Sequence, residues 1–272
     1  MTNKPNVMAT PEPWDLVASG YADTTMQMLA QYAEHAVDTL ALHQGSKVLD
    51  VACGSGSVSL MVAARVASVD AIDFSLSMLE ICQKKADEGN IKNIQTFHGD
   101  AQNLPYDDER FDAAISMFGL MFFPDRKAGL SEIYRTLKQG GRVAIGSWAP
   151  VADSPAMDIV FGALREMNPD IPEPQTIIDS LENPDVFQAE LEAAGFKDVN
   201  IKRVTKHFPV ETIANFWKDL VKGNAGFTMM KHQMSEAEWH EKEKLALVYL
   251  QKHIPNTPTT LAADAWLGTG LK

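Results

Sequence analysis

Residues 47–149 alternate short apolar runs with segments of helical periodicity. The runs KVLDVA, VDAIDF, NIQTFHGD, FDAAISMF and RVAIGSWAP are typical of strands, and VSLMVAARV, SLSMLEICQKKADEG and RKAGLSEIYRTLKQGG are typical of helices. Strands that alternate with helices form βαβ units and favour a parallel sheet with helices on both faces. Such crossovers are right-handed, so the carboxyl ends of the strands meet at one edge. We therefore expect an α/β fold with a ligand site at that edge.

Length and charge limit the classes of partner. The chain has 272 residues and a net charge of −12, which makes binding to nucleic-acid phosphates or to an anionic membrane surface a poor prospect. No apolar run is long enough for a membrane span, and the opening residues lack the apolar core of a signal peptide. Cys53 and Cys82 form no pattern of metal ligands. We expect a cytoplasmic protein with no metal, no nucleic-acid partner and no integral membrane association.

The flanking segments have different patterns. Residues 1–13 are polar and rich in proline, which predicts a loose tail, and residues 22–42 have the apolar spacing of a helix. Residues 151–185 carry five prolines and few periodic segments; residues 211–254 look helical apart from KGNAG, and TLAADAWLGTGLK resembles a last strand. We divide the chain into a tail and helix over the ligand site (1–45), a ligand-binding core (46–150) and a C-terminal part (151–272) with a helical cap at about 211–254.

The stretch VLDVACGSGSVSL, residues 48–60, places a small-residue loop between a strand and a helix. Glycines in such a loop let a ligand approach the backbone closely. A dinucleotide fingerprint would need a third small residue where Ser59 stands, so the match to that motif is weak. A tight turn that simply needs glycine is the alternative interpretation.

Two acidic residues follow at the ends of the next two strand patterns. Asp73 lies 17 residues beyond Gly56, which is close to the spacing of a carboxylate that holds two vicinal ribose hydroxyls. Asp100, in HGDAQNLP, could accept a hydrogen bond from an exocyclic amine such as that of adenine. The alternatives are a helix-leading or solvated Asp73 and a strand-capping Asp100.

Four segments in order, VLDVACGSG, AIDFSLSML, HGDAQNLPYDDERFDAAIS and LSEIYRTLKQGGRVAI, resemble the motifs of class I S-adenosylmethionine (SAM)-dependent methyltransferases. The closest group is the UbiE/Coq5-like (methyltransferase type 11) small-molecule enzymes, and the resemblance covers residues 47–148. It implies a Rossmann-like, mostly parallel seven-stranded sheet with helices on both faces, a last strand antiparallel beside the fifth, and a helical cap. It also implies SAM as the cofactor and S-adenosylhomocysteine as the product.

The resemblance assigns roles to individual residues. Gly54 and Gly56 would pack against the methionine part of SAM, with Asp50 shaping its amino-acid end. Asp73 would hold the ribose, and Asp100 would meet the adenine amine. The full set of expected cofactor-binding residues is Asp50, Ala52, Gly54, Ser55, Gly56, Asp73, Phe74, Met78, Asp100, Ala101, Gln102 and Phe118.

Methyl transfer from a sulfonium is a direct displacement with a neutral leaving group, so positioning alone can supply on the order of 7–11 kcal/mol. A small, partly apolar metabolite would need an apolar pocket, for which the candidates are Trp14, Tyr21, Met121, Phe122, Phe227, Met229 and Met230. In KGNAGFTMMKHQM, Gly223 and Gly226 could act as hinges of a mobile cap, and a plain connecting loop is the alternative. His232 is the candidate catalytic base, although none is required.

Two other functions share parts of this pattern. An NAD(P)-dependent oxidoreductase also has the strand, the glycine loop and the carboxylate, but the missing third glycine and GDAQNLP count against it. A non-catalytic SAM-binding regulatory module would share the cofactor site, and the aromatic residues of the C-terminal part count weakly against it. The sequence leaves open the methyl acceptor, the choice of O-, N- or C-methylation, and the oligomeric state.

Overall fold

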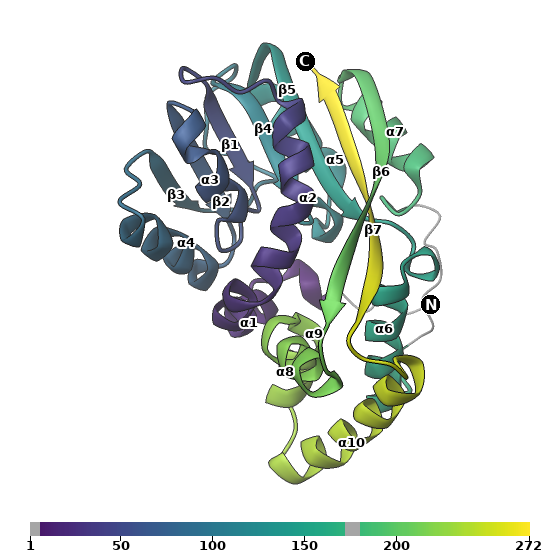
Figure 1. The fold of residues 1–272 in the computed structure, drawn as a ribbon. Coiled ribbons are helices and arrows are strands. Elements are labelled where there is room, and N and C mark those ends of the chain that lie inside the picture. Colours follow the sequence, from purple (N-terminus) through teal and green to yellow (C-terminus); the bar gives the residue numbers. More distant parts are fainter. Residues whose placement is uncertain (1–5, 172–179) are drawn as a thin grey trace.

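A computed structural model describes residues 6–171 and 180–272, which form one seven-stranded sheet with helices on both faces (Figure 1). The strand order is β3-β2-β1-β4-β5-β7-β6. The strands are β1 (Lys47–Val51), β2 (Ser68–Asp73), β3 (Ile94–His98), β4 (Phe111–Met117), β5 (Leu137–Trp148), β6 (Lys197–Val210) and β7 (Thr259–Leu271). The order reverses between β1 and β4, and open α/β sheets bind their ligands at such a switch point.

The sheet is mixed. The pairs β1–β2, β1–β4, β2–β3 and β4–β5 are parallel, whereas β7 is antiparallel to both of its neighbours, β5 and β6. The expectation of a mostly parallel sheet is therefore wrong. After β6 the chain passes through further helices and comes back to the sheet as β7, which runs in the direction opposite to β5 and β6. The expected seven strands, and the antiparallel place of the last strand beside the fifth, are confirmed.

Helices cover both faces of the sheet because successive residues of its buried strands point to opposite sides. Val48 packs into the cluster under α2 (Thr25–Thr39), α3 (Ser57–Val62) and α4 (Leu76–Glu88). The next residue, Leu49, packs into the cluster under α5 (Arg126–Thr136) and α7 (Pro184–Ala193). The core of the domain therefore lies in two layers, one on each side of β1.

The strands β6 and β7 continue beyond the rest of the sheet as a two-stranded ribbon (Figure 1). Between them lie α8 (Ile213–Gly223), α9 (Ala225–His232) and α10 (Glu236–His253), which we call the helical insertion. These helices pack with α6 (Pro155–Met167) around an apolar cluster that includes Trp217, Phe227 and Leu250. The insertion thus has a core of its own.

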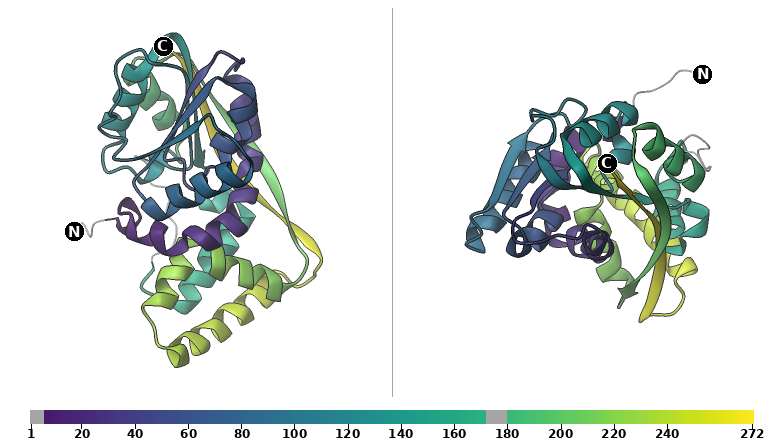
Figure 2. Two further views of the ribbon diagram at one scale, coloured as in Figure 1. Left: turned by 90° about the vertical axis from the view of Figure 1, so that its left-hand side faces the viewer. Right: turned by 90° about the horizontal axis from the view of Figure 1, so that it is seen from above.

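Helix α1 (Glu12–Asp23) lies between the sheet and the helical insertion (Figure 2). On one side, the carboxylate of Asp15 accepts a 2.6 Å hydrogen bond from the Ser75 hydroxyl at the start of α4. On the other side, Lys222 Nζ of α8 donates a 2.6 Å hydrogen bond to the carboxylate of Asp23. At Gly20 a Cβ atom would lie only 1.8 Å from the Lys222 carbonyl oxygen, so the two helices can approach this closely only because Gly20 has no side chain.

Several expected boundaries are corrected. The tail predicted for residues 1–13 contains a 3-10 helix, η1 (Val7–Ala9), and the start of α1 at Glu12, while residues 1–5 lie outside the described residues. The single helix expected over residues 22–42 is divided at Thr24 between α1 and α2. The helix expected to end at Gly140 ends at Thr136, because Leu137 is buried in the core and already pairs with Phe111 of β4.

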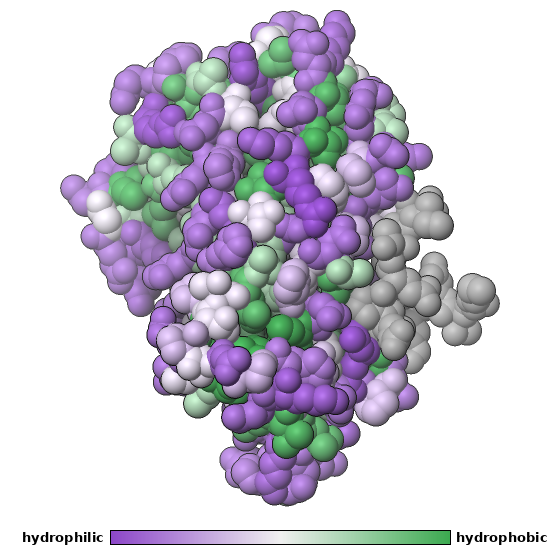
Figure 3. Space-filling model, turned by 45° about the vertical axis from the view of Figure 1, so that its right-hand side comes forward, coloured by the Kyte–Doolittle hydropathy of each residue, from purple (hydrophilic) through white to green (hydrophobic). Residues whose placement is uncertain are grey.

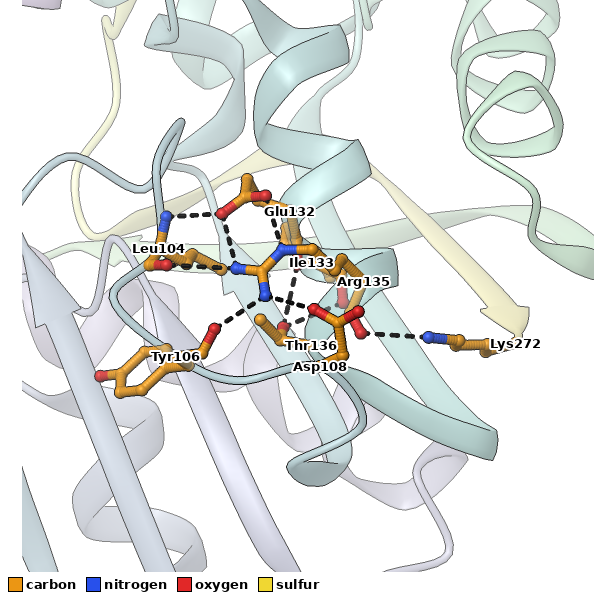
Figure 4. A network of polar contacts seen from close by, with 8 residues as sticks. All are labelled: Leu104, Tyr106, Asp108, Glu132, Ile133, Arg135, Thr136 and Lys272. Atoms are coloured by element: carbon orange, nitrogen blue, oxygen red, sulfur yellow. Dashed lines mark hydrogen bonds and ion pairs between the residues drawn. The ribbon is translucent and has the colours of Figure 1, made fainter.

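The loop between β3 and β4 is held by a polar network (Figure 4). The Arg135 guanidinium donates to the carbonyl oxygens of Leu104 and Tyr106 and to the carboxylates of Asp108 and Glu132. Glu132 also accepts the Leu104 N–H at 2.7 Å, and the hydrogen bonds from Arg135 lower the pKa of Glu132. This network fixes the loop that begins with the predicted ligand residue Asp100.

Hydrophilic residues cover most of the face in Figure 3, in line with the net charge of −12. Within residues 6–171 and 180–272, no helix has both the length and the apolar character needed to cross a membrane. In the same residues, no cluster of three or more His, Cys, Asp or Glu side chains is placed to hold a metal ion.

Candidate functional site

A cavity of about 1200 Å³ lies at the carboxyl ends of the central strands, and α1 and the helical insertion form part of its wall. Typical small-molecule sites measure about 300–1000 Å³, so this cavity has room for a cofactor and a second molecule. We call its two parts the glycine-loop side and the α6 side. The glycine-loop side contains Trp14, Tyr21, Ala52, Gly54, Asp73, Phe74, Met78, Asp100, Ala101, Gln102 and Phe118. The α6 side contains Ser147, Trp148, Ala156, Met157, Val160, Phe161, Leu164, Phe208, Phe216, Leu261 and Ala263.

The two glycines of the loop after β1 have different surroundings. Both have positive φ, +53° at Gly54 and +88° at Gly56, a conformation that favours glycine. A Cβ at Gly54 would meet nothing within 4 Å, so this backbone is open where it lines the cavity. A Cβ at Gly56 would lie 2.4 Å from Cys82 Sγ of α4. Gly54 therefore exposes backbone to a ligand, while Gly56 lets the loop pack on α4.

The carboxylate of Asp73 is fixed at the end of β2. Its Oδ2 accepts the Gly54 N–H at 2.8 Å, and its Oδ1 accepts the Ser75 N–H at 2.9 Å. A carboxylate accepts about four hydrogen bonds, so Asp73 retains capacity for a further donor beside the backbone N–H groups of Gly54, Phe74 and Ser75. Burial raises the pKa of Asp73 to about 6, although these backbone donors oppose the shift. A neutral hydroxyl group of a ligand could donate to this carboxylate without adding charge.

Asp50 lies beneath the loop rather than on the cavity wall. Its Oδ2 accepts hydrogen bonds from the Ser59 N–H at 3.0 Å and the Ser59 hydroxyl at 2.6 Å, which holds the first turn of α3. Burial raises the pKa of Asp50 to about 7. Ser55 and Gly56, also expected to bind the cofactor, are buried and do not line the cavity. The structure therefore gives these three positions a supporting place behind the loop.

Asp100 is exposed at the end of β3 and lines the cavity. It accepts the backbone N–H of Gln102 at 2.8 Å and the Gln102 side-chain amide at 3.0 Å. Gln102 Oε1 in turn accepts the Asp125 N–H at 2.7 Å, at the start of α5. An exposed carboxylate with a fixed orientation is suited to accept from an amine of a bound ligand.

Phe118 forms the boundary between the two sides of the cavity. It has a φ of +61°, and its N–H donates to the Gly146 carbonyl of β5 at 2.9 Å. Its ring lies 4.4 Å from that of Trp148. A Cβ at the next residue, Gly119, would lie 2.3 Å from the Cβ of Ala52. The turn after β4 thus packs closely against the glycine loop.

Four of the seven residues expected to contact the acceptor line the cavity: Trp14, Tyr21, Met121 and Phe122. The rings of Trp14 and Phe122 meet edge to face with centroids 5.1 Å apart. Burial and the nearby Asp73 charge raise the pKa of Tyr21, so its hydroxyl keeps its proton. These side chains come from α1 and from the turn after β4, so they enclose the glycine-loop side.

The other expected residues lie elsewhere. Phe227 is fully buried against Trp217, with ring centroids 5.2 Å apart, and Met229 and Met230 are also absent from the cavity wall. His232 is exposed and outside the cavity. Residues 223–226, at the junction of α8 and α9, line the cavity, whereas Phe227 and Met230 pack into the core of the insertion.

Gly223, one of the two expected hinges, packs closely against the corner between α1 and α2. Its carbonyl accepts a 2.8 Å hydrogen bond from the Thr25 hydroxyl, and a Cβ there would lie 1.9 Å from Thr24 Oγ1. The absence of a side chain therefore allows the insertion to pack against the α1–α2 corner.

Sequence reasoning missed α6, which supplies much of the apolar wall. Residues 172–179, with Pro172 and Pro174, lie outside the described residues, but residues 155–167 are helical. The signal was present: proline at the first helical position after Ser154, then buried residues at helical spacing, namely Ala156, Val160, Ala163, Leu164 and Met167.

Residues 48–141 match a family whose description is "Methyltransferase domain". Residues 48–141 therefore form a methyltransferase domain. Demethylmenaquinone methyltransferase of Staphylococcus epidermidis is 41% identical over 115 residues, which are 41% of this chain and 47% of that protein. The Listeria welshimeri protein of the same name is 33% identical over 123 residues, or 44% of this chain and 52% of the relative. The chain thus spans about half the length of the curated relatives that it matches.

Solved structures share the fold of this methyltransferase domain over more of the chain. A putative methyltransferase from Bacillus halodurans C-125 has a TM-score of 0.58 at 20% identity, covering 88% of this chain and 98% of that one. YcgJ from Bacillus subtilis has a TM-score of 0.57 at 19% identity, covering 88% and 97%. A Haemonchus contortus N-methyltransferase solved with S-adenosylhomocysteine has a TM-score of 0.55 at 16% identity, covering 89% and 53%.

Proposed function

We propose that this protein is an enzyme that transfers the methyl group of SAM to a small, partly apolar metabolite by direct displacement. One observation carries the proposal: the glycine-loop side and the apolar α6 side belong to the same cavity. A donor on the first side and an acceptor on the second would meet in a space shielded from water. Holding two reactants in this way can supply on the order of 7–11 kcal/mol.

The glycine-loop side fits SAM. The open backbone at Gly54 suits the methionine part, the remaining acceptor capacity of Asp73 suits the ribose hydroxyls, and the exposed carboxylate of Asp100 suits the adenine amine. When bound, SAM supplies an electrophilic methyl group and a neutral leaving group. The contribution of the chain is to bind, orient and exclude water.

Positioning alone accounts for catalysis in this proposal. Trp14, Phe122 and the Phe118–Trp148 pair enclose the cavity with aromatic rings. His232, exposed and outside the cavity, has no path to a reacting atom, so we assign no general base.

Ligand binding tests the cofactor and separates the enzyme from an NAD(P)-dependent oxidoreductase. A ligand at a hundred times its dissociation constant stabilises the folded state by about 2.7 kcal/mol. We expect SAM and S-adenosylhomocysteine to raise the unfolding temperature, and NAD(H) and NADP(H) to leave it unchanged. Stabilisation by a nicotinamide cofactor alone would overturn the proposal.

An acceptor screen tests the reaction. Candidate metabolites are incubated with SAM, and release of S-adenosylhomocysteine is measured. A demethylmenaquinone belongs in the set because the relatives carry that name, but the family match ends at residue 141, before α6 and the helical insertion. Cofactor binding without turnover of any acceptor would favour the non-catalytic regulatory module. A cytosolic location stays a prediction.

A further inference from the structure

Helix α10 forms the outer edge of the helical insertion and is apolar on two faces (Figure 1). One face carries Trp239, Ala246 and Leu250, which are buried in the core of the insertion. Leu245 and Val248 lie on the opposite side of the helix, where 47% of Leu245 and 70% of Val248 are exposed. No residue of this helix, which is described in full, lines the large cavity. Single exposed apolar residues are common on protein surfaces, so the significance of this pair depends on its neighbours.

Glu241 and Lys252 extend this apolar pair into a stripe of four exposed residues, which we call the α10 stripe. Positions 241, 245, 248 and 252 are separated by four, three and four residues, so they lie on one side of the helix. The same spacing forms the seam along which two helices pack in a coiled coil. Beside Val248 lies a groove of about 400 Å³, lined also by Leu247, Gln251 and Lys252. The stripe and the groove together could receive the side chains of another helix.

The α10 stripe is complementary to itself when two copies of the helix run in opposite directions. With a two-fold axis between residues 246 and 247, Leu245 of one copy faces Val248 of the other. In the same arrangement Glu241 faces Lys252 at both ends of the stripe. A parallel arrangement would instead place Glu241 against Glu241 and Lys252 against Lys252, and like charges repel. The pattern of charge therefore favours a second copy of this chain in one orientation.

Glu241 already contacts a lysine within its own helix. Lys244 Nζ donates a 2.7 Å hydrogen bond to Glu241 Oε1, and both side chains are more than half exposed. An exposed pair of this kind contributes little to stability, and a carboxylate accepts about four hydrogen bonds. Glu241 can therefore keep this contact and still accept from Lys252 of a second copy.

We propose that the α10 stripe is the interface of a weak, two-fold symmetric dimer of this protein. The stripe spans three helical turns, or about 16 Å along the axis. A contact limited to one helix of each copy buries less than the roughly 1,200 Å² of stable complexes, so the dimer should form in the micromolar range or above. Because no residue of α10 lines the cavity, the interface is separate from the ligand site.

Sedimentation velocity at protein concentrations up to the millimolar range measures the dimer. The wild type is compared with Val248→Glu, Glu241→Lys, Lys252→Glu and the double variant Glu241→Lys/Lys252→Glu. Glu88→Lys on α4 is the matched control, because Glu88 is also exposed and also pairs with a lysine of its own helix, Lys84. Thermal unfolding of each protein verifies that it is folded. Sedimentation requires no bound SAM, so its outcome is independent of the proposed function.

We expect the wild type and Glu88→Lys to dimerise with the same dissociation constant, and Val248→Glu to be monomeric at every concentration. Each single charge reversal on α10 should weaken the dimer about ten-fold, because it brings like charges together at both ends of the stripe. The double reversal should restore the affinity of the wild type, since opposite charges meet again at each end.

A wild type that stays monomeric at every concentration, or a dimer that Val248→Glu leaves intact, would overturn the inference. Failure of the double reversal to restore the dimer would overturn it as well, because only the antiparallel arrangement pairs Glu241 with Lys252. Co-sedimentation with phosphatidylcholine vesicles is measured on the same proteins. A monomer whose binding to these vesicles is lost in Val248→Glu would assign the α10 stripe to a lipid surface instead.

Discussion

The backbone N–H of Gly54 donates a 2.8 Å hydrogen bond to Oδ2 of Asp73, and this bond ties the glycine loop after β1 to the end of β2. The Ser75 N–H holds the other oxygen, so the carboxylate is oriented before any ligand arrives. A site organised in advance loses less conformational freedom on binding, which favours affinity.

The first prediction concerns this carboxylate. In Asp73→Ala, two ribose hydroxyls lose a charged acceptor, and hydrogen bonds to charged groups contribute about 1.5–3 kcal/mol. We expect the affinity for S-adenosylhomocysteine to fall ten-fold or more, measured by calorimetric titration. Asp87→Ala, an exposed substitution on α4, serves as the control and should bind normally. Unchanged affinity in a folded Asp73→Ala protein would reject the assignment.

The second prediction concerns pH and Asp50. Burial raises the pKa of Asp50 from 3.8 to about 7. Between these two pH values the folded state holds a proton that the unfolded state has lost. The contribution of Asp50 to stability is therefore complete below pH 3.8 and is lost as the pH rises to about 7. Relative to Asp50→Asn, the wild type should lose up to about 1.4 kcal/mol per pH unit across this window.

Urea unfolding of both proteins at pH 5, 6 and 8 measures this difference. Comparison with the asparagine variant cancels the opposite contributions of carboxylates such as Glu132, whose pKa is lowered. A stability difference independent of pH would show that Asp50 is ionised throughout.

The third prediction separates the two loop glycines. Both Gly54→Ala and Gly56→Ala place a side chain at positive φ, which costs roughly 1 kcal/mol. Only Gly56→Ala also forces a Cβ against Cys82 Sγ, so it should be much the less stable of the two in thermal unfolding. Gly54→Ala should fold but bind S-adenosylhomocysteine weakly, because its methyl group enters the open space beside the loop. Normal affinity in Gly54→Ala would mean that no ligand approaches there.

The fourth prediction concerns the contact between α1 and the helical insertion. In Gly20→Ala the new methyl group clashes with the Lys222 carbonyl, so α1 must move away from α8. Amide hydrogen exchange in residues 12–23 should become faster. Ser19→Ala, exposed on the same helix, is the matched control and should exchange like the wild type. Equal exchange in both variants would show that the contact does not hold α1 in place.

The glycine-loop side was largely predictable from the sequence, since strand patterns, loop glycines and strand-end carboxylates are local signals. Gly54, Asp73 and Asp100 do line the cavity. Asp50 also stands at the end of a strand, but its carboxylate accepts hydrogen bonds from Ser59 under the loop. The sequence pattern alone does not distinguish this orientation from one toward the cavity.

The α6 side was less predictable. The direction of a helix such as α9 depends on contacts across the molecule, so a cluster of methionines alone did not distinguish a cavity wall from the core in which Phe227 lies. Proline-rich surroundings obscured the helical spacing of α6, although that signal was local.

The ribbon of β6 and β7 carries the helical insertion beyond the sheet, and only two chain connections join the insertion to the rest. Replacement of the segment between Val210 and Thr259 in evolution would alter one wall of the cavity while leaving β1, β2 and the glycine loop untouched. Such an arrangement lets acceptor preference diverge faster than cofactor use among descendants of one ancestor. For engineering, grafting a foreign segment between these two strands offers a route to new acceptors on an unchanged donor site.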